Sequence, residues 1–392
     1  MIDTAAQLRD LIAHARRHER VALDTEFVWE RTYYPNLGLV QLGLDRDETF
    51  LIDAVRLDDL APLGDLLTDP GVVKVLHDAQ QDLTILRRAT GAAPKNVFDT
   101  RLAGGFVGLT ATTSLQGLIG ATTGVHLPKG ESRSDWLRRP LSDAQLTYAR
   151  DDVRYLMDAY DELRERIRAL GREVWVGEEM AQFDDPALYE EDDPYVRYRH
   201  VKGRGKRGFS ARDYAVLREL AAWREREARR ANRPRGHIVH DDVLVEFARR
   251  KPASVEEIGA VQGISDRTLR RYGPDLVAAV ERGLAVPKAE RPQSPTRRRA
   301  DDADLARFER AQALLRARSL HADLDPVLVS NRAGVERLVF AGPEADPAEH
   351  ALLRGWRSDF VGEALLDILR GGAVDVEPAK GLPRLSGNGH DR

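Results

Sequence analysis

Short apolar runs separated by polar links fill the N-terminal quarter of the chain and limit what it can fold into. Residues 21–27, 37–44 and 49–54 each read as a β-strand, and the turn 45–48 consists only of charged residues. Three strands in succession with short links predict an antiparallel meander. The chain therefore begins as a sheet, not as a helical bundle.

Strands and helices alternate after the meander. The spacing of apolar residues predicts the following elements: a helix over 57–67, a strand over 72–76, a helix over 78–88, a strand over 96–100, and helices over 101–108, 114–120 and 143–169. Ser142 and Gln145 form a capping-box pattern at the start of the last helix. A meander followed by strand–helix units predicts an α/β fold with a mixed sheet and helices on its faces.

Charge is distributed unevenly along the chain. The net charge is −4, yet residues 201–300 hold 24 Lys and Arg against 13 Asp and Glu. An acidic stretch, 178–194, precedes this basic segment and reads as a solvated linker. The asymmetry indicates a polyanion partner such as a nucleic acid. Solvated faces of ordinary helices are the alternative explanation.

The composition excludes several classes of protein. Cysteine is absent, which removes disulfides, cysteine zinc sites and thiol nucleophiles. No run approaches the roughly 18 apolar residues of a membrane-spanning helix, and the N-terminus lacks the apolar core of a signal peptide. We therefore expect a cytoplasmic protein, and a length of 392 residues predicts two or three domains.

Two acids end the first apolar run. Asp24 and Glu26 are two residues apart in a predicted strand, so both carboxylates point to the same face. Neighbouring carboxylates on an apolar strand repel each other unless a cation binds there. Asp-x-Glu is common in sequences, so an ordinary strand end is an equal alternative for this motif taken alone.

Three further residues complete a possible hydrolytic site. Asp82 falls in the first turn of the predicted helix 78–88, where an acid also suits the helix dipole and where Asp78 is a rival. Tyr148 and Asp152 are four residues apart and share one face of a helix, with surface packing as the alternative. We assign Asp99 to a structural hydrogen bond. Several carboxylates with a tyrosine suit two-metal hydrolysis of a phosphodiester, with Mg²⁺ or Mn²⁺ as the cations.

In this order, the motifs resemble those of the Tyr-type DEDD 3′–5′ exonuclease superfamily. Asp24 and Glu26 match its first motif, Asp82 the second, and Tyr148 with Asp152 the third. The similarity extends to the ribonuclease D family, and the following segments carry it: 127–136, 139–142, Trp223-Arg224, Arg233-Pro234, Ile238, Asp241, Leu244, Gly263-Ile264 and 328–332.

The resemblance implies a multidomain chain. It implies an N-terminal ribonuclease-H-like 3′–5′ exonuclease domain followed by two small all-α domains of the HRDC (helicase-and-ribonuclease-D C-terminal) type. The expected boundaries are an exonuclease domain over 1–195, a linker over 196–209, a first HRDC domain over 210–287, a linker over 288–301, a second, divergent HRDC-like domain over 302–372, and a disordered tail over 373–392.

The resemblance also implies a mechanism. Two divalent cations about 4 Å apart would hold the scissile phosphate. Asp24 would bridge them, with Glu26 and Asp152 on the side of the attacking water and Asp82 on the side of the leaving group. Tyr148 would position the water, and nucleoside 5′-monophosphates would leave one by one from a 3′ hydroxyl end.

Substrate and partners follow as further expectations. The family implies maturation of tRNA precursors and other small stable RNAs. We expect a monomer without an obligate protein partner. The candidates for substrate contact are Phe27, Trp29, His77, Gln81, Lys129 and Arg133. For Phe27 and Trp29, stacking on bases and packing in the core are equal alternatives. A DNA exonuclease and a catalytically inactive RNA-binding protein are the rival functions.

Overall fold

A computed structural model describes residues 1–128, 130–131, 134–204, 209–293 and 300–372. The chain divides into two compact units. Unit 1 comprises Met1–Phe27, Leu37–Tyr189 and the described part of Arg299–Arg392. Unit 2 comprises Val28–Asn36 and the described part of Glu190–Arg298. Within the residues described, no helix is long and apolar enough to span a membrane.

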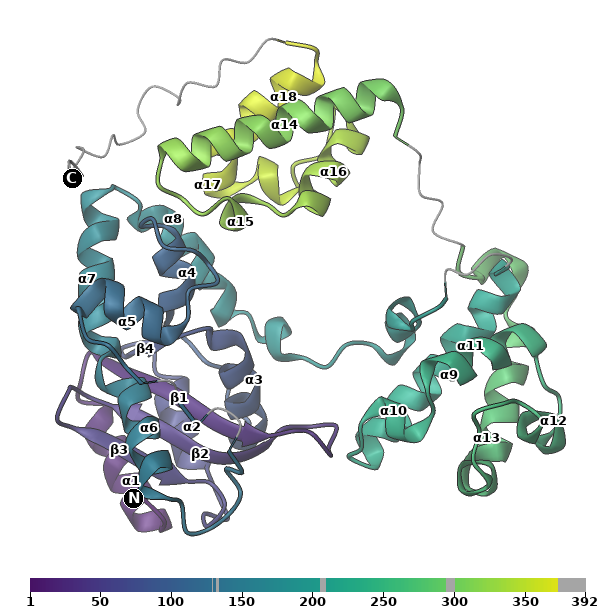
Figure 1. Ribbon diagram of the computed structural model, residues 1–392, viewed down its shortest axis with the longest axis horizontal. Coiled ribbons are helices and arrows are strands. Elements are labelled where there is room, and N and C mark those ends of the chain that lie inside the picture. Colours follow the sequence, from purple (N-terminus) through teal and green to yellow (C-terminus); the bar gives the residue numbers. More distant parts are fainter. Residues whose placement is uncertain (129, 132–133, 205–208, 294–299, 373–392) are drawn as a thin grey trace. The chain divides into compact units, whose positions relative to one another are not determined.

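Unit 1 is built around one mixed sheet of five strands (Figure 1). The strands are β1 (Arg20–Val28), β2 (Asn36–Gly43), β3 (Thr49–Asp53), β4 (Val73–Leu76) and β5 (Val97–Asp99), in the order β3-β2-β1-β4-β5. The β2–β3 pair is antiparallel, whereas β1–β4 and β4–β5 are parallel. The mixed sheet expected from the sequence is therefore confirmed.

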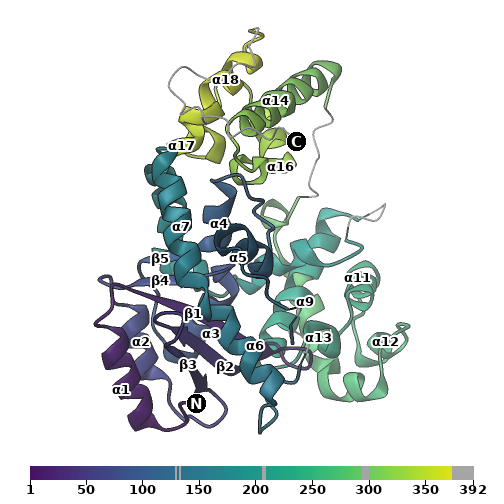
Figure 2. The same cartoon turned by 60° about the vertical axis from the view of Figure 1, so that its left-hand side comes forward.

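Helices cover both faces of this sheet (Figure 2). In chain order, the helices of this part of unit 1 are α1 (Ala5–Ala15), α2 (Ala61–Leu67), α3 (Ala79–Thr90), α4 (Thr100–Gly105), α5 (Leu115–Thr123), α6 (Asp143–Arg154), α7 (Leu156–Ala169) and α8 (Glu173–Met180). Side chains alternate along β1. Val21 and Leu23 join the main apolar core, and Ala22 packs in a second cluster with residues of α6 and α7.

Asp24 and Glu26 have the same parity as Ala22, so β1 presents them on the face that α6 covers. The predicted capping box is present, because the Ser142 hydroxyl accepts from the backbone of Gln145, whose side chain accepts from Ser142. The helix α6 therefore begins where the sequence predicts.

Two expectations from the sequence need correction. The helix predicted over 143–169 is two helices, because the backbone turns at Tyr155 between α6 and α7. The stretch 178–194 is not a solvated linker along its whole length. Its first part forms the end of α8 and two 3₁₀ turns, η1 (Ala181–Asp184) and η2 (Pro186–Tyr189), which bury Phe183 and Tyr189.

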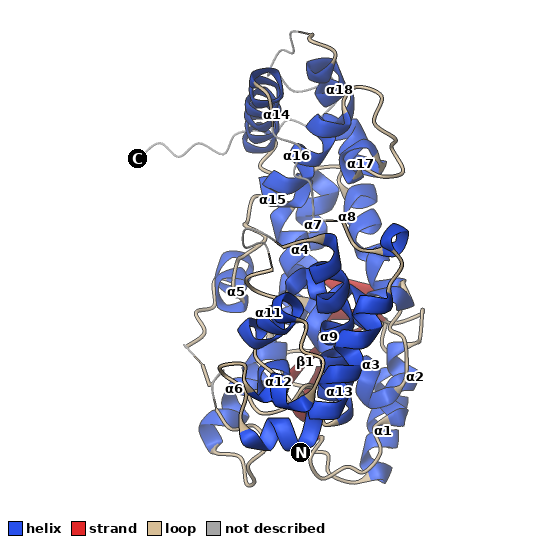
Figure 3. Cartoon of the chain, turned by 90° about the vertical axis from the view of Figure 1, so that its right-hand side faces the viewer, coloured by secondary structure: helices blue, strands red, loops and turns tan. Residues whose placement is uncertain are grey.

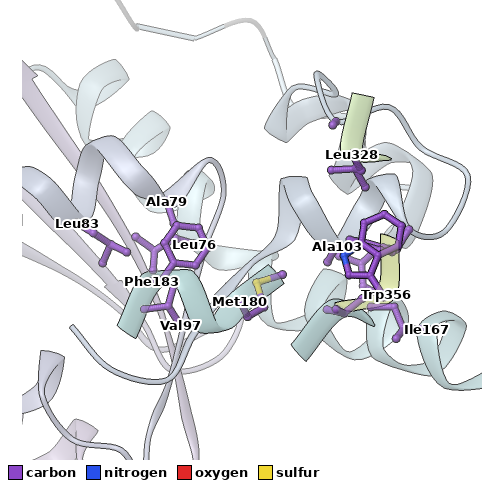
Figure 4. Packing of buried hydrophobic residues seen from close by; sticks show 14 of the residues in the cluster. Leu76, Ala79, Leu83, Val97, Ala103, Ile167, Met180, Phe183, Leu328 and Trp356 are labelled. Atoms are coloured by element: carbon purple, nitrogen blue, oxygen red, sulfur yellow. The ribbon is translucent and has the colours of Figure 1, made fainter. Parts of the chain in front are cut away.

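The C-terminal helices of unit 1 share a core with the nuclease helices. They are α14 (Asp302–His321), α15 (Pro326–Val329), α16 (Arg332–Ala341), α17 (Gly355–Arg357) and α18 (Glu363–Leu369), with a 3₁₀ turn η5 (Ala351–Leu353) and a π-helical turn η6 (Ser358–Gly362). Figure 4 shows Leu328 and Trp356 close to Ala103 and Ile167. Segments far apart in the sequence thus bury one continuous apolar cluster.

Polar contacts join the same helices. Arg172 is 1% exposed, and its guanidinium donates hydrogen bonds to the backbone carbonyls of Phe106 and Ala322. These two residues are the C-caps of α4 and α14. A cation suits these positions because carbonyls at a helix C-terminus carry partial negative charge. Glu179 accepts from the indole of Trp356 at 2.9 Å and pairs with Arg357.

Outside residues 28–36, the regular elements in the described part of unit 2 are all helices (Figure 3). Its elements are a 3₁₀ helix η3 (Pro194–His200), α9 (Ala211–Arg230), α10 (Arg235–Ile238), α11 (Asp241–Arg250), α12 (Val255–Gly259), α13 (Asp266–Ala285) and a 3₁₀ turn η4 (Lys288–Glu290). Leu217, Leu220, Leu244 and Leu276 lie in its apolar core. Ser210 caps α9 and accepts from the backbone of Asp213.

Candidate active site

Three separate elements of unit 1 carry the acids singled out in the sequence. Asp24 and Glu26 come from β1, Asp82 from the first turn of α3, and Asp152 from α6. Carboxylate oxygens of Asp24, Glu26 and Asp152 all lie within 4.8 Å of one another. Glu26, Asp82 and Asp152 are each no more than 9% exposed. Close, buried carboxylates of this kind suit a divalent cation.

Asp82 is linked to the strand that carries the first two acids. Thr25 lies between Asp24 and Glu26 in β1, and its hydroxyl donates a hydrogen bond to Oδ1 of Asp82. Thr25 is 5% exposed, so this bond forms away from solvent. The bond connects β1 with α3.

Tyr148 and Asp152 meet on one face of α6, as their spacing predicts. The Tyr148 hydroxyl donates a hydrogen bond to the Asp152 carboxylate. The ring of Tyr148 lies beside that of Trp136, with the centroids 6.1 Å apart. The tyrosine is therefore held at its ring and at its hydroxyl.

The negative charges of the clustered carboxylates repel one another. Burial raises the pKa of Asp24 well above its usual range, and the nearby Asp82, Asp152 and Glu26 raise it further. Burial, with Asp152 and Asp82, raises the pKa of Glu26 to about 9. A bound cation would relieve this repulsion, because an opposite charge favours the ionised carboxylates.

The pKa values of Asp82, Asp152 and Tyr148 are raised as well. Burial raises the pKa of Asp82 to about 7, although the hydrogen bond from Thr25 acts in the opposite direction. Burial and the neighbouring Asp151 raise the pKa of Asp152 to about 7. The pKa of Tyr148 is raised by burial and by Asp152, which keeps the phenol protonated and able to donate.

Gly130, singled out in the sequence only as part of the segment 127–136, belongs to this site. A Cβ atom built on Gly130 would lie 1.6 Å from Cε2 of Tyr148. The backbone at this position therefore touches the tyrosine ring, and only glycine leaves room for it. A cavity of about 350 Å³ opens beside it, lined among others by Leu127, Thr147 and Tyr148.

The structure separates the two other acids considered near the second motif. Asp78 has a left-handed backbone (φ 64°) and pairs with Arg101, and its side chain is 56% exposed. Asp99 accepts from the backbone N–H groups of Ala79 at 2.9 Å and Arg101 at 2.8 Å. The structural hydrogen bond expected of Asp99 is confirmed.

The candidates for substrate contact have different surroundings. Trp29 is 59% exposed, Phe27 is half-buried, and Gln81 is exposed. Both ring nitrogens of His77 have protein partners, namely the Thr100 hydroxyl and the Thr113 carbonyl, each at 3.0 Å. Lys129 and Arg133 lie outside the described residues.

A second group of possible ligands lies elsewhere in unit 1. His14, His18 and Glu48 also hold ligand atoms within 4.8 Å of one another. Both ring nitrogens of His14 are already engaged, however, by Glu48 at 3.0 Å and by Arg17 at 2.7 Å. The carboxylate cluster is therefore the candidate metal centre.

Comparisons with known proteins agree with this geometry. A 3′–5′ exonuclease family model matches residues 1–168, and an HRDC domain model matches residues 213–280. Ribonuclease D of Desulfotalea psychrophila is 38% identical over 361 residues, which cover 92% of this chain and 96% of that protein. Ribonuclease D of Granulibacter bethesdensis is 37% identical over 374 residues, which cover 95% of this chain and 92% of that protein.

A solved structure is similar over almost the same length. The crystal structure of Escherichia coli RNase D, an exoribonuclease involved in structured RNA processing, matches with a TM-score of 0.83 and 30% identity. The match covers 95% of this chain and 98% of that one. The HRDC domain expected after the nuclease is thereby confirmed, and the chain belongs to the ribonuclease D family of 3′–5′ exonucleases.

Proposed function

We propose that the chain hydrolyses RNA from its 3′ hydroxyl end and releases nucleoside 5′-monophosphates. The observation that carries the proposal is the meeting of Asp24, Glu26 and Asp152, from two distant segments, within 4.8 Å, with Asp82 tied to them through Thr25. Buried acids that raise one another's pKa are unstable in their ionised forms unless a cation is bound beside them.

The proposed cofactors are two divalent cations, Mg²⁺ or Mn²⁺, held by Asp24, Glu26, Asp82 and Asp152. When bound, such cations supply Lewis-acid stabilisation of the phosphate and lower the pKa of a bound water. Oxygen-only ligands favour these hard cations over zinc. Side chains of the protein are proposed to orient the attacking water and to contact the RNA.

Tyr148 is the proposed group that orients the attacking water. Its hydroxyl is already fixed by Asp152, and its ring by Gly130 and Trp136. Because burial keeps the phenol protonated, the hydroxyl acts by hydrogen bonding and not as a free base. The 350 Å³ cavity beside Tyr148 is the proposed place for the terminal nucleotide.

We propose that Phe27, Trp29 and Gln81 contact the RNA, with the exposed Trp29 stacking on a base. His77 would contact RNA through its ring carbons, because both of its nitrogens are engaged. Lys129 and Arg133 are proposed for phosphate contacts on their charge alone.

The basic helical segment 201–300 is proposed to bind the RNA backbone. Residues 201–300 carry the excess of basic residues, so binding through them would not depend on sequence and would weaken with salt. We propose domain limits of 1–195, 210–287 and 302–372. A second HRDC-like copy over 302–372 is supported by helix lengths, since α14, α15 and α16 have 20, 4 and 10 residues, as do α9, α10 and α11.

The proposed substrates are tRNA precursors and other small stable RNAs, and the proposed state is a monomer in the cytoplasm. A time course on 5′-labelled single-stranded RNA tests the activity, with Mg²⁺ or Mn²⁺, an EDTA control and DNA of the same sequence. We expect a metal-dependent ladder that shortens from the 3′ end of RNA only. Equal cleavage of DNA would favour a DNA exonuclease, and RNA bound but uncut would leave an RNA-binding protein.

A further inference from the structure

The segment that follows the first acidic motif folds as part of unit 2. Residues 28–36 run from the last residue of β1 to the first residue of β2, yet they group with Glu190–Arg298 and not with the rest of the two strands. The segment begins two residues after Glu26 and contains Trp29, which is 59% exposed. What holds these residues therefore affects groups close in sequence to the proposed catalytic acids.

Tyr33 is the side chain that anchors the segment. Its hydroxyl donates a hydrogen bond to Glu225 of α9 and accepts from Arg235 at 2.9 Å and from Arg229 at 3.2 Å. The guanidinium carbon of Arg235 lies 4.8 Å from the centre of the tyrosine ring, a cation–π distance. One tyrosine thus satisfies a carboxylate and two guanidinium groups.

Asn232 holds the backbone of the same segment. Its Oδ1 accepts from the backbone N–H of Tyr33 at 3.2 Å and of Tyr34 at 3.0 Å. Asn232 has a positive φ of 45°, a conformation that asparagine, aspartate and glycine adopt more readily than other residues. The loop after α9 therefore presents an acceptor aimed at two consecutive amides.

Glu225 gives this arrangement a fixed charge at its centre. Its side chain is 1% exposed and pairs with Arg197 at 3.3 Å, with Arg229 at 3.1 Å and with Arg235. Burial acts to raise the pKa of Glu225, but the bonds from Arg235 and Tyr33 outweigh it and lower the pKa to about 2. The acceptor for Tyr33 is therefore ionised throughout the working range of pH.

We propose that Tyr33 and Asn232 are positioning residues, which fix the segment 28–36 so that Trp29 is ready to receive the RNA. Unit 2 then takes part in turnover as well as in RNA binding. The inference rests on the proposed function, because it assigns a role in turnover. Its substrate class is the same, the 3′-terminal part of a single-stranded RNA.

Four variants of the full-length chain test the proposal. Tyr33→Phe removes only the hydroxyl, and Tyr195→Phe, at a tyrosine of unit 2 that is 40% exposed, is its control. Asn232→Gly removes the acceptor without straining the positive φ, and Asn232→Asp keeps the acceptor as the conservative rescue. Each variant is compared with the parent for thermal unfolding, amide hydrogen exchange, and kcat and KM on a short RNA.

Loss of one hydrogen bond should lower the ratio of the positioned to the released state of the segment by about fivefold. We expect Asn232→Gly to speed exchange at the amides of Tyr33 and Tyr34 by about that factor or more, and to lower kcat about equally. Tyr33→Phe should lower kcat in the same range. Asn232→Asp and Tyr195→Phe should stay within about twofold of the parent, and all four should unfold near the parent temperature.

Two results would overturn the proposal. One is an unchanged kcat in Asn232→Gly although the segment exchanges faster, and the other is unchanged exchange in that variant. The exchange measurement needs no RNA, so it reports on the segment even if the parent chain fails to cut RNA. A parent chain without RNA hydrolysis would refute the proposed function instead.

Discussion

The hydroxyl of Thr25 donates a hydrogen bond to Oδ1 of Asp82, and this bond joins the strand of the first two acids to the helix of the third. Neither residue is more than 8% exposed. The sequence shows Thr25 only as the residue between Asp24 and Glu26. Its side chain points to the other face of β1, where it orients an acid that the strand does not carry.

Replacing Thr25 with valine tests this link. Thr25→Val keeps the shape but removes the donor, so Asp82 loses its fixed orientation, and we expect metal affinity to fall about tenfold or more. Thr25→Ser, which keeps the hydroxyl, is the control. Isothermal titration with Mn²⁺ measures the affinity, and equal values for the parent and Thr25→Val would show that the bond does not serve the metal site.

Gly130→Ala should disturb the tyrosine of the third motif. The added Cβ would meet Cε2 of Tyr148 at 1.6 Å, so the ring must move, and a shift of about 1 Å near reacting groups can cost about a hundredfold in rate. Gly177→Ala is the matched control, because a Cβ on this helical glycine meets nothing within 4 Å. The measurement is kcat of both variants. A Gly130→Ala enzyme as fast as the Gly177→Ala control would show that the contact between Gly130 and Tyr148 does not position the tyrosine.

The carboxylate cluster predicts an unusual dependence of stability on pH in metal-free protein. The folded chain keeps protons on Glu26 up to a pKa of about 9 and on Asp82 and Asp152 up to about 7. The unfolded chain releases them near pH 4. The folded state therefore binds more protons in this window, and the free energy of unfolding should fall as the pH rises from about 5 to 9.

Thermal unfolding in EDTA across this range checks the sign. Asp24→Asn removes one of the repelling charges, so we expect that variant to be more stable than the parent at pH 8 and to vary less with pH. Added Mg²⁺ should stabilise the parent more at high pH, since only ionised carboxylates bind it. A parent chain whose metal-free stability rises through this range would show that the acids do not repel as described.

Arg172 predicts how firmly the C-terminal helices are attached within unit 1. Arg172→Ala leaves the carbonyls of Phe106 and Ala322 without their donor, and we expect a loss of about 3 kcal/mol in the free energy of unfolding. Arg168→Ala, at an exposed arginine one turn earlier, should cost less than about 0.5 kcal/mol. Denaturant unfolding compares the two, and equal stabilities would mean that the buried guanidinium contributes nothing.

Deletion of residues 205–392 bears on the same contacts. From the sequence, this truncation is expected to weaken RNA binding and to spare chemistry on short oligonucleotides. It would also remove Leu328 and Trp356 from the core they share with Ala103 and Ile167, and the Ala322 carbonyl that accepts from Arg172. We therefore expect a less stable nuclease, so activity on a dinucleotide must be compared at a temperature where the truncated chain is folded.

The sequence predicted local elements better than their packing. The bounds of the five predicted strands lie within two residues of those observed, because apolar runs bounded by polar turns are a local signal. The pairing of Tyr148 with Asp152 also follows from helical spacing alone. By contrast, α1 was not expected, and the acidic stretch 178–194 looked solvated although Phe183 and Tyr189 in it are buried.

These differences have a common physical cause. Burial of an aromatic residue inside an acidic stretch depends on a surface supplied by distant residues, which local composition does not reveal. The same holds for Gly130, whose value lies in its approach to Tyr148, and for Tyr33, whose partners lie about 200 positions away. The part that could not be predicted is therefore the part made by long-range contacts.

The most direct test of the proposed site compares two adjacent acids of α6. Asp152 lies in the cluster, whereas Asp151 pairs with Arg154 at 3.2 Å. Single-turnover cleavage of RNA with saturating Mn²⁺ should fall by about a thousandfold or more in Asp152→Asn and in Asp24→Asn, with RNA binding retained, since several kcal/mol of charge stabilisation are lost. Asp151→Asn keeps all four acids of the site but removes a charge that raises the pKa of Asp152, so it should stay within about tenfold of the parent. An Asp152→Asn enzyme that trims RNA at the rate of Asp151→Asn would contradict the account.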